Sequence, residues 1–170
     1  MSKTLGILMV VLSSLLFTYI KADDMKRRLE NIKQLKRGLG IIKNEIMFSS
    51  REMGDIALEL SETLEGDLSF IFKGVAEKMR ENTHIGFGQA WEEEVIACKN
   101  ILPERAVKIM NDFSYMAGKM SKEIEILNIE KTMDILDEET KEEFLNYTKN
   151  RKLIFSLGAI SALSVTILFL

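Results

Sequence analysis

The residue types that most often perform chemistry are scarce in this chain. It has one histidine, His84, and one cysteine, Cys98. A histidine can activate a cysteine thiol when a third group orients the imidazole, but no sequence pattern brings these two residues together or supplies such a group. We therefore interpret His84 as a turn or packing residue. A membrane hydrolase that uses Cys98 and His84 is kept as an alternative.

Two short patterns resemble nucleotide or metal sites only superficially. The fragment Gly86-x-Gly88 lacks the lysine and the preceding strand of a phosphate-binding loop, so we expect no ATP hydrolysis by this chain. Three consecutive carboxylates, Glu92, Glu93 and Glu94, point in different directions on a helix and are typical of a solvated face. Metal sites usually show clustered His or Cys ligands. We predict a non-enzymatic protein with no metal and no cofactor.

Trp91 has two interpretations that the sequence leaves open. It shares a helical face with Val95 and Cys98, which is typical of a core aromatic. Tryptophan is also enriched at binding hot spots, so it could instead anchor a partner.

Both ends of the chain are apolar. Residues 4–20 and 153–170 carry no charged side chain and have no polar face. A membrane-spanning helix needs roughly 20 apolar residues, and flanking lysine and arginine side chains can extend a slightly shorter segment. We therefore predict a transmembrane helix over 4–20, a helical domain over 21–152 and a second transmembrane helix over 153–170.

Basic residues flank these segments on their inner sides. The positive-inside rule places such residues on the cytoplasmic side, so we expect residues 21–152 in the cytoplasm. A single cysteine, which cannot form an internal disulfide, suits that compartment. The expected membrane-flanking residues are Lys21, Lys26, Arg27, Arg28, Lys149, Arg151 and Lys152.

The first apolar segment has an alternative interpretation as a cleaved secretory signal. The protein would then be an exported helical adaptor anchored by its C-terminal segment. The cleavage site before Ala22 fits poorly, because Lys21 and the bulky Ile20 precede it. The basic residues that follow also oppose export.

The region between the segments is mildly acidic. All 26 acidic residues lie in it, and Lys3 alone of the 23 basic residues lies outside, which gives it a net charge of −4. This balance argues against a nucleic-acid partner, which would require a basic surface. Its length suffices for one domain.

Helical periodicity dominates this region. Apolar residues recur at steps of three and four from Met25 to Ile46, and again from Ile126 to Tyr147. Four shorter segments show the same rhythm. The first ends before Gly66, and the second begins at Asp67, which is a candidate helix cap. The third covers 89–100, and the fourth follows Pro103, which we expect in its first turn. No segment alternates with a period of two. We predict an all-α fold, a bundle of five or six helices flanked by the two transmembrane helices.

Several short motifs resemble the stage III sporulation protein AB family. They are Glu45-Ile46-Met47-Phe48 at the end of the first long helix, Ala90-Trp91-Glu92, Phe113 followed by Ala117-Gly118, and Ser156-Leu157-Gly158. The resemblance covers the whole chain. Ser114, Ser121 and Glu125 depart from the family pattern.

The resemblance implies a role in the channel complex between mother cell and forespore. Family members are similar in fold to the inner-membrane platform protein of type II secretion and type IV pilus machines. By that analogy, the protein would be a scaffold in the mother-cell membrane facing the forespore, with its central domain in the cytoplasm. Its partners would be a secretion-type ATPase, other membrane subunits and the lipid bilayer, and self-association is left open. The motif residues Glu45, Trp91 and Glu92 are the expected partner-binding positions.

Overall fold

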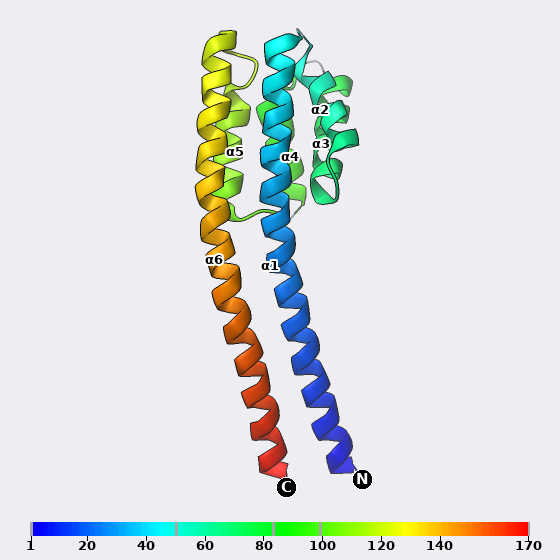
Figure 1. The fold of residues 1–170 in the computed structure, drawn as a ribbon. Helices are drawn as coiled ribbons and strands as arrows, with labels where there is room; N and C mark the ends of the chain where they lie inside the picture. Colours follow the sequence, from blue (N-terminus) through cyan, green and yellow to red (C-terminus); the bar gives the residue numbers. More distant parts are fainter. Residues whose placement is uncertain (1, 50, 83, 99, 170) are drawn as a thin grey trace. The chain divides into compact units, whose positions relative to one another are not determined.

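The structure, a computed structural model, describes residues 2–49, 51–82, 84–98 and 100–169. Within residues 2–18 and 154–169, most side chains lie outside the described part. Over the described residues the chain forms six α-helices and no strand, which confirms the predicted all-α class (Figure 1). The helices are α1 (Ser2–Phe48), α2 (Met53–Thr63), α3 (Asp67–Glu81), α4 (Phe87–Ala97), α5 (Glu104–Met116) and α6 (Lys122–Phe169).

The backbone divides into two compact units. One unit is Arg28–Lys141, and the other combines Met1–Arg27 with Glu142–Leu170. The helices α1 and α6 each contribute to both units. The unit Arg28–Lys141 contains α2 to α5 complete, and the buried apolar core of the described residues lies in it. We refer to this unit as the helical domain.

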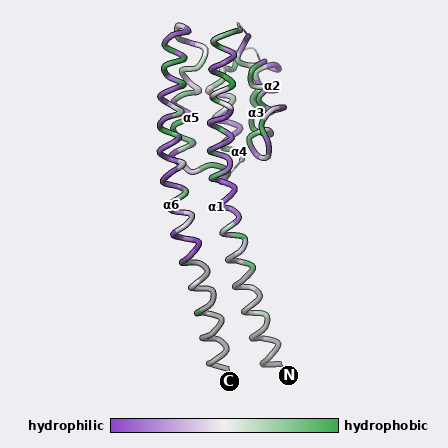
Figure 2. Tube along the Cα trace, in the orientation of Figure 1, coloured by the Kyte–Doolittle hydropathy of each residue, from purple (hydrophilic) through white to green (hydrophobic). Residues whose placement is uncertain are grey.

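The part of α1 in the helical domain buries the face that its sequence rhythm predicts. Leu29, Ile32, Leu35, Leu39 and Ile42 are all buried, because steps of three and four return a side chain to the same side of a helix. Figure 2 shows this alternation of hydrophobic and hydrophilic positions along the upper part of α1.

Close approaches and turns hold the shorter helices against this face. Gly38 of α1 allows Leu64 to approach, since a Cβ at Gly38 would lie 3.2 Å from Leu64 Cδ1. The turn before α3 needs Gly66, which has a φ of +63°. The rings of Phe72 on α3 and Trp91 on α4 then pack with centroids 5.4 Å apart. The core is therefore continuous from α1 through α3 to α4.

Two predicted helix starts are shifted by one residue. Asp67 is the first residue of α3 and Gly66 is its N-cap, so the prediction that Asp67 caps the helix is wrong. Its carboxylate instead accepts a hydrogen bond of 2.9 Å from Asn31 Nδ2 of α1. Pro103 is the N-cap residue of α5 and does not lie in its first turn.

The last helix contributes both apolar and polar side chains to the domain. Ile129 and Leu136 are fully buried, whereas Phe144, on the same predicted face, is 53% exposed. Three polar side chains, Glu125, Thr132 and Glu139, are also buried. The Glu125 carboxylate accepts a hydrogen bond of 2.6 Å from the backbone N–H of Gly118, which closes the turn between α5 and α6.

Among the described residues, no helical stretch combines the length and the apolar character that a bilayer crossing requires. Most side chains of the predicted spans 4–20 and 153–170 lie outside the described residues. The two transmembrane helices therefore stay predictions.

Candidate interaction surfaces

The two residues considered for hydrolysis lie at opposite ends of one helix. His84 precedes α4 in an exposed turn, where its backbone N–H donates a hydrogen bond of 3.1 Å to Asn82 Oδ1. Cys98 is the C-cap residue of the same helix. At 1.5 Å per residue, a helix of 11 residues separates them by roughly 16 Å. A direct pair between the imidazole and the thiol is therefore excluded in this fold.

The surroundings of Cys98 also oppose nucleophilic chemistry. Burial raises the pKa of the thiol above its ordinary value, and the carboxylates of Glu94 and Asp67 raise it further. A reactive cysteine instead needs an electropositive environment that stabilises the thiolate. We interpret Cys98 as a packing residue.

The glycine pair before α4 serves helix packing. Gly86 is the N-cap of α4, and Gly88 lies in its first turn. A Cβ at Gly88 would stand 2.7 Å from the Cα of Tyr115 in α5. Only glycine permits this close approach of the two helices. Packing therefore explains why residue 88 is glycine, and phosphate binding is not needed to explain it.

The three consecutive carboxylates make structural contacts in different directions. Glu92 accepts a hydrogen bond from the Tyr115 hydroxyl, which raises the pKa of that phenol. Glu93 and Glu94 lie 2.8 Å and 3.1 Å from Lys78 Nζ of α3. Glu92 thus contacts α5 while Glu93 and Glu94 both contact α3, so the run links α4 to its neighbours and the prediction of a simply solvated face is wrong. Among the described residues, no group of three His, Cys, Asp or Glu side chains is placed to hold a metal ion.

Trp91 occupies the centre of the core. Its side chain has no exposed surface, and its indole N–H donates a hydrogen bond of 3.0 Å to Asn111 Oδ1 of α5. Of the two interpretations that the sequence leaves open, the structure favours the core aromatic. A partner could reach this ring only if the core opened.

Glu45 lies near the end of α1 in a polar network. Its carboxylate accepts a hydrogen bond of 2.7 Å from Ser49 Oγ and lies 3.5 Å from Arg51 Nη1. Arg51 also pairs with Glu59 of α2. The motif residue Glu45 therefore fixes the turn from α1 to α2, and the structure does not bring it together with Trp91 or Glu92.

The basic residues that the sequence predicts to flank the membrane are exposed with one exception. Lys21, Lys26, Arg27, Lys149, Arg151 and Lys152 have exposed side chains, and the Arg151 guanidinium lies 6.0 Å from the centre of the Tyr147 ring. Arg28 is half-buried and donates a hydrogen bond of 3.1 Å to the carbonyl of Asn100. Arg28 thus also has a structural role in the helical domain.

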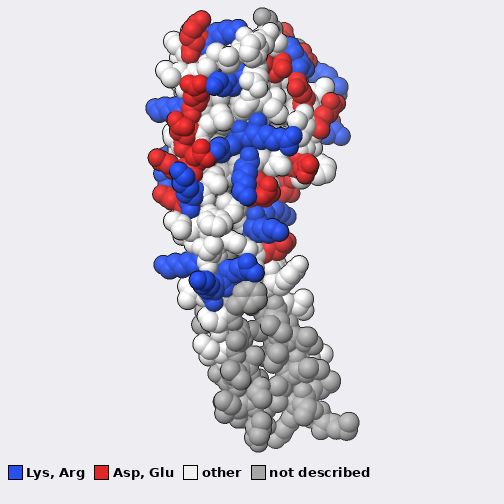
Figure 3. Space-filling view, in the orientation of Figure 1, with Lys and Arg blue, Asp and Glu red and all other residues white. Residues whose placement is uncertain are grey.

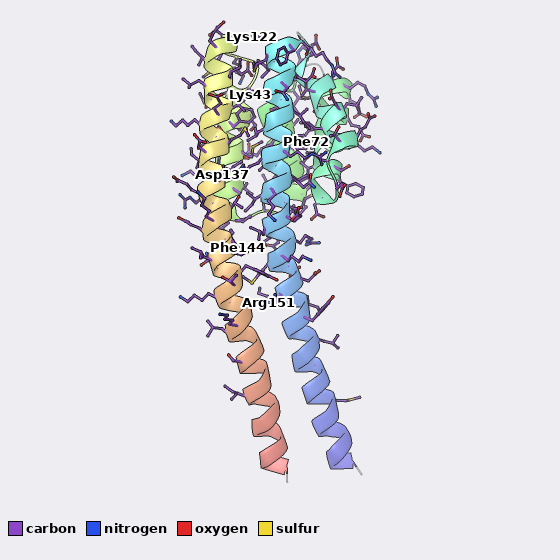
Figure 4. All side chains as sticks on the ribbon, in the orientation of Figure 1. Lys43, Phe72, Lys122, Asp137, Phe144 and Arg151 are labelled. Carbon is purple, nitrogen blue, oxygen red and sulfur yellow. The ribbon has the colours of Figure 1, made fainter. Side chains whose placement is uncertain are left out.

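Ion pairs join α1 to α6 along the helical domain. Lys36 pairs with Asp137, and Lys43 Nζ lies 2.6 Å from Glu130 Oε1. Figure 4 labels Lys43 on α1 and Asp137 on α6. At the far end, Lys122 Nζ donates a hydrogen bond of 2.5 Å to the carbonyl of Met47. The two helices that the sequence predicts to continue into the membrane are therefore tied to each other within the domain.

Three carboxylates of α6 face solvent. Glu123, Asp134 and Glu138 are exposed and form no ion pair within the described part of the chain. Intervals of 11 and 4 residues place them on one side of the helix. Figure 3 shows acidic side chains along α6 at the left edge of the molecule. We call these three residues the acidic face of α6.

A groove of about 780 Å³ runs between α2 and α3. Two of its apolar lining residues are unusually exposed, Phe70 at 72% and Leu58 at 46%. The hydroxyl of Ser69 donates a hydrogen bond of 2.6 Å to the carbonyl of Ser61, which joins the two helices within the groove. We call this feature the α2–α3 groove.

The groove was not predicted from the sequence, although two residues of the sequence are consistent with it. Leu58 falls between Ile56 and Leu60, and Phe70 falls between Leu68 and Ile71. Both are therefore large apolar residues off the buried faces of their helices. An off-face residue on one helix is uninformative, because scattered exposed apolar residues are normal. Its meaning depends on the second helix that the fold brings beside it.

Comparisons with known proteins agree with the fold. The family model described as stage III sporulation protein AB matches residues 3–170. A solved structure of a stage III sporulation protein AB is similar to this chain, with a TM-score of 0.65 and 15% sequence identity. The alignment covers 72% of this chain and 97% of the solved one. A search of curated proteins gave no match.

Proposed function

Because this chain belongs to the stage III sporulation protein AB family, we propose that it is a non-enzymatic scaffold subunit of the sporulation channel complex. Family membership gives it a role in sporulation. We further propose that its helical domain docks a secretion-type ATPase in the cytoplasm, while the segments 4–20 and 153–170 anchor it in the mother-cell membrane facing the forespore. Other membrane subunits of the complex and the lipid bilayer would be its remaining partners.

The contacts between α1 and α6 carry this proposal. The Lys36–Asp137 and Lys43–Glu130 pairs join residues about a hundred positions apart in the chain. If both helices continue into the membrane, the domain is held there at two points. A subunit held at two points can fix a partner in place, and it needs no catalytic site to do so.

The acidic face of α6 is our candidate docking surface for the ATPase. Its carboxylates are exposed and unpaired within the described residues, so they are free to meet basic side chains of a partner. Complementary charge at an interface speeds association and selects the partner. The resemblance stated from the sequence implies a likeness of the family to secretion platforms, which motivates the ATPase, and a site-level test is therefore required.

Co-purification from membranes of the sporulating source organism tests the docking. We expect the full chain to retain the ATPase, and the variant Asp134→Lys with Glu138→Lys to lose most of it. Glu65→Lys with Glu81→Lys is the matched control, because it makes the same charge change at exposed positions away from α6. Failure of the unaltered chain to retain the ATPase would contradict the proposal.

Reporter fusions test the topology. Alkaline phosphatase is active only after export, so a fusion in the loop near Glu65 should be inactive, and a cytoplasmic reporter there should be active. Active phosphatase, or a mature N-terminus near Ala22, would instead support the exported adaptor.

A further inference from the structure

The α2–α3 groove has the features of a helix-binding site. Its apolar lining includes Leu58 of α2 and Phe70 and Met79 of α3, with Ala76 buried beneath. The shorter of the two flanking helices has 11 residues, so the groove extends over roughly 16 Å. That length accommodates about three turns of a partner helix. Amphipathic helices commonly bind by placing their apolar face in such a groove.

The charges on the two edges of the groove are unequal. Glu52, Asp55 and Glu62 line the α2 side, and the lining residues of α2 include no basic side chain, although Arg51, just before the helix, lies close to Asp55. Lys73, Glu77 and Arg80 line the α3 side, with a net charge of +1. None of these six forms an ion pair within the described residues, whereas Glu59 nearby is paired with Arg51. The groove therefore presents one uniformly acidic edge beside an apolar floor.

We propose that the α2–α3 groove binds an amphipathic helix of a protein partner, whose apolar stripe covers Phe70 and Leu58 and whose basic edge faces α2. The carboxylates of Glu52, Asp55 and Glu62 select lysine and arginine on that edge. The inference deepens the scaffold function and rests on it, because it names a surface and a partner chemistry that are distinct from the acidic face of α6.

A bilayer or helix α1 of a second copy fits this groove less well. Cytoplasmic membrane surfaces are anionic and would repel the acidic edge. The exposed basic face of α1 in a second copy, which includes Lys33 and Arg37, has no large exposed apolar residue between Arg28 and Ile46. It therefore offers no stripe to cover Phe70.

Two helical peptides test the proposal on the full chain purified in nonionic detergent. Both have about 18 residues, which is long enough to hold a helix, and the same leucine stripe. One carries lysine along one edge, and the other carries glutamate there. We expect the lysine peptide to bind at least about tenfold more tightly than the glutamate peptide in a fluorescence anisotropy titration at low salt.

Variants locate the binding. Phe70→Glu should weaken binding of the lysine peptide by about tenfold or more, because hot-spot aromatic residues carry much of the binding energy. Ile96→Glu is the matched control, since Ile96 on α4 is 65% exposed and lies outside the groove. Asp55→Lys with Glu62→Lys should reverse the preference between the two peptides. Circular dichroism melting checks that each variant is folded.

Three results would overturn the inference. The first is that the two peptides bind equally or that neither binds. The second is that Phe70→Glu binds the lysine peptide as well as the unaltered chain does. The third is that Phe70→Glu dissociates an oligomer of the full chain, which would identify a second copy as the occupant. The assay contains no ATPase. Its failure is therefore distinct from a failure of the ATPase to co-purify.

Discussion

Gly88 of α4 lies directly against the backbone of Tyr115 in α5, so that a Cβ at Gly88 would stand 2.7 Å from the Tyr115 Cα. The obstructing atom belongs to the backbone of a helix and cannot rotate away. This single contact sets how closely α4 and α5 approach, and α4 carries the Trp91 ring into the core.

Gly88→Ala should destabilise the domain. The added methyl group forces α4 and α5 apart, and overpacking of this kind costs about 1–3 kcal/mol. Gly40→Ala is the matched control, because Gly40 lies inside α1 with no atom within 4 Å of the added Cβ. That change should stabilise the chain by about 0.5–1 kcal/mol through helix propensity. Thermal unfolding followed by circular dichroism compares the two, and equal effects would contradict the close approach.

The hydrogen bond between Trp91 and Asn111 gives a second prediction. Asn111→Ala leaves the buried indole N–H without its acceptor, which costs about 1–3 kcal/mol. Asn44→Ala, at an exposed position on α1, should change the free energy of unfolding by less than about 0.5 kcal/mol. Denaturant titration measures both, with emission of the single tryptophan as the signal. Equal stability of the two variants would count against a buried Trp91.

Periodicity within one helix was sufficient to predict which face of α1 is buried. Leu29, Ile32 and Leu35 follow from spacing alone, because a helix repeats its faces every three or four residues. The prediction from residue type that Asp67 caps the next helix was wrong. The deciding contact comes from Asn31, which lies 36 residues away in the sequence and also donates a hydrogen bond of 3.0 Å to the carbonyl of Ile101. Local pattern cannot reveal a partner that only the fold brings near.

The interaction surfaces also differ in whether one helix alone was sufficient to predict them. The acidic face of α6 follows from one helix alone, because Glu123, Asp134 and Glu138 recur on one side of it. The α2–α3 groove requires two helices to be placed side by side, so neither Leu58 nor Phe70 alone was sufficient to predict it. Trp91 is the reverse case, since its type suggested a binding role while its neighbours Phe72 and Asn111 hold it in the core.

The ion pair between Lys43 and Glu130 should make a small, salt-dependent contribution. Both side chains are partly exposed, at 29% and 49%, and exposed pairs are worth about 0.2–1 kcal/mol. A double-mutant cycle with Lys43→Met and Glu130→Gln should give a coupling in that range. The coupling should fall at about 1 M salt, where charges are screened within a few ångströms.

The pair Lys33 and Glu30 within α1 serves as a reference for that cycle. Its separation is 3.3 Å and both side chains are more than half exposed. Its coupling should be no larger than about 0.5 kcal/mol, because neighbours on one helix contribute little. A larger coupling for the reference pair than for Lys43 and Glu130 would argue against the contact between α1 and α6.

The hydrogen bond from Tyr115 to Glu92 predicts a change at alkaline pH. The Glu92 carboxylate raises the pKa of the Tyr115 phenol above its ordinary value of 10.0, chiefly because the protonated hydroxyl donates to it. A folded-state pKa above the unfolded value means that the contribution to stability is complete below pH 10.0. It is lost as the pH rises through the raised pKa.

Glu92→Gln should therefore lower the pH at which Tyr115 ionises, because the neutral amide no longer favours the protonated phenol or repels the phenolate. An ultraviolet absorbance titration detects tyrosinate, and subtraction of the Tyr115→Phe curve isolates this residue from the other two tyrosines. The double variant Tyr115→Phe with Glu92→Gln should titrate as Tyr115→Phe does. An unchanged midpoint in Glu92→Gln would show that the carboxylate does not hold the hydroxyl in solution.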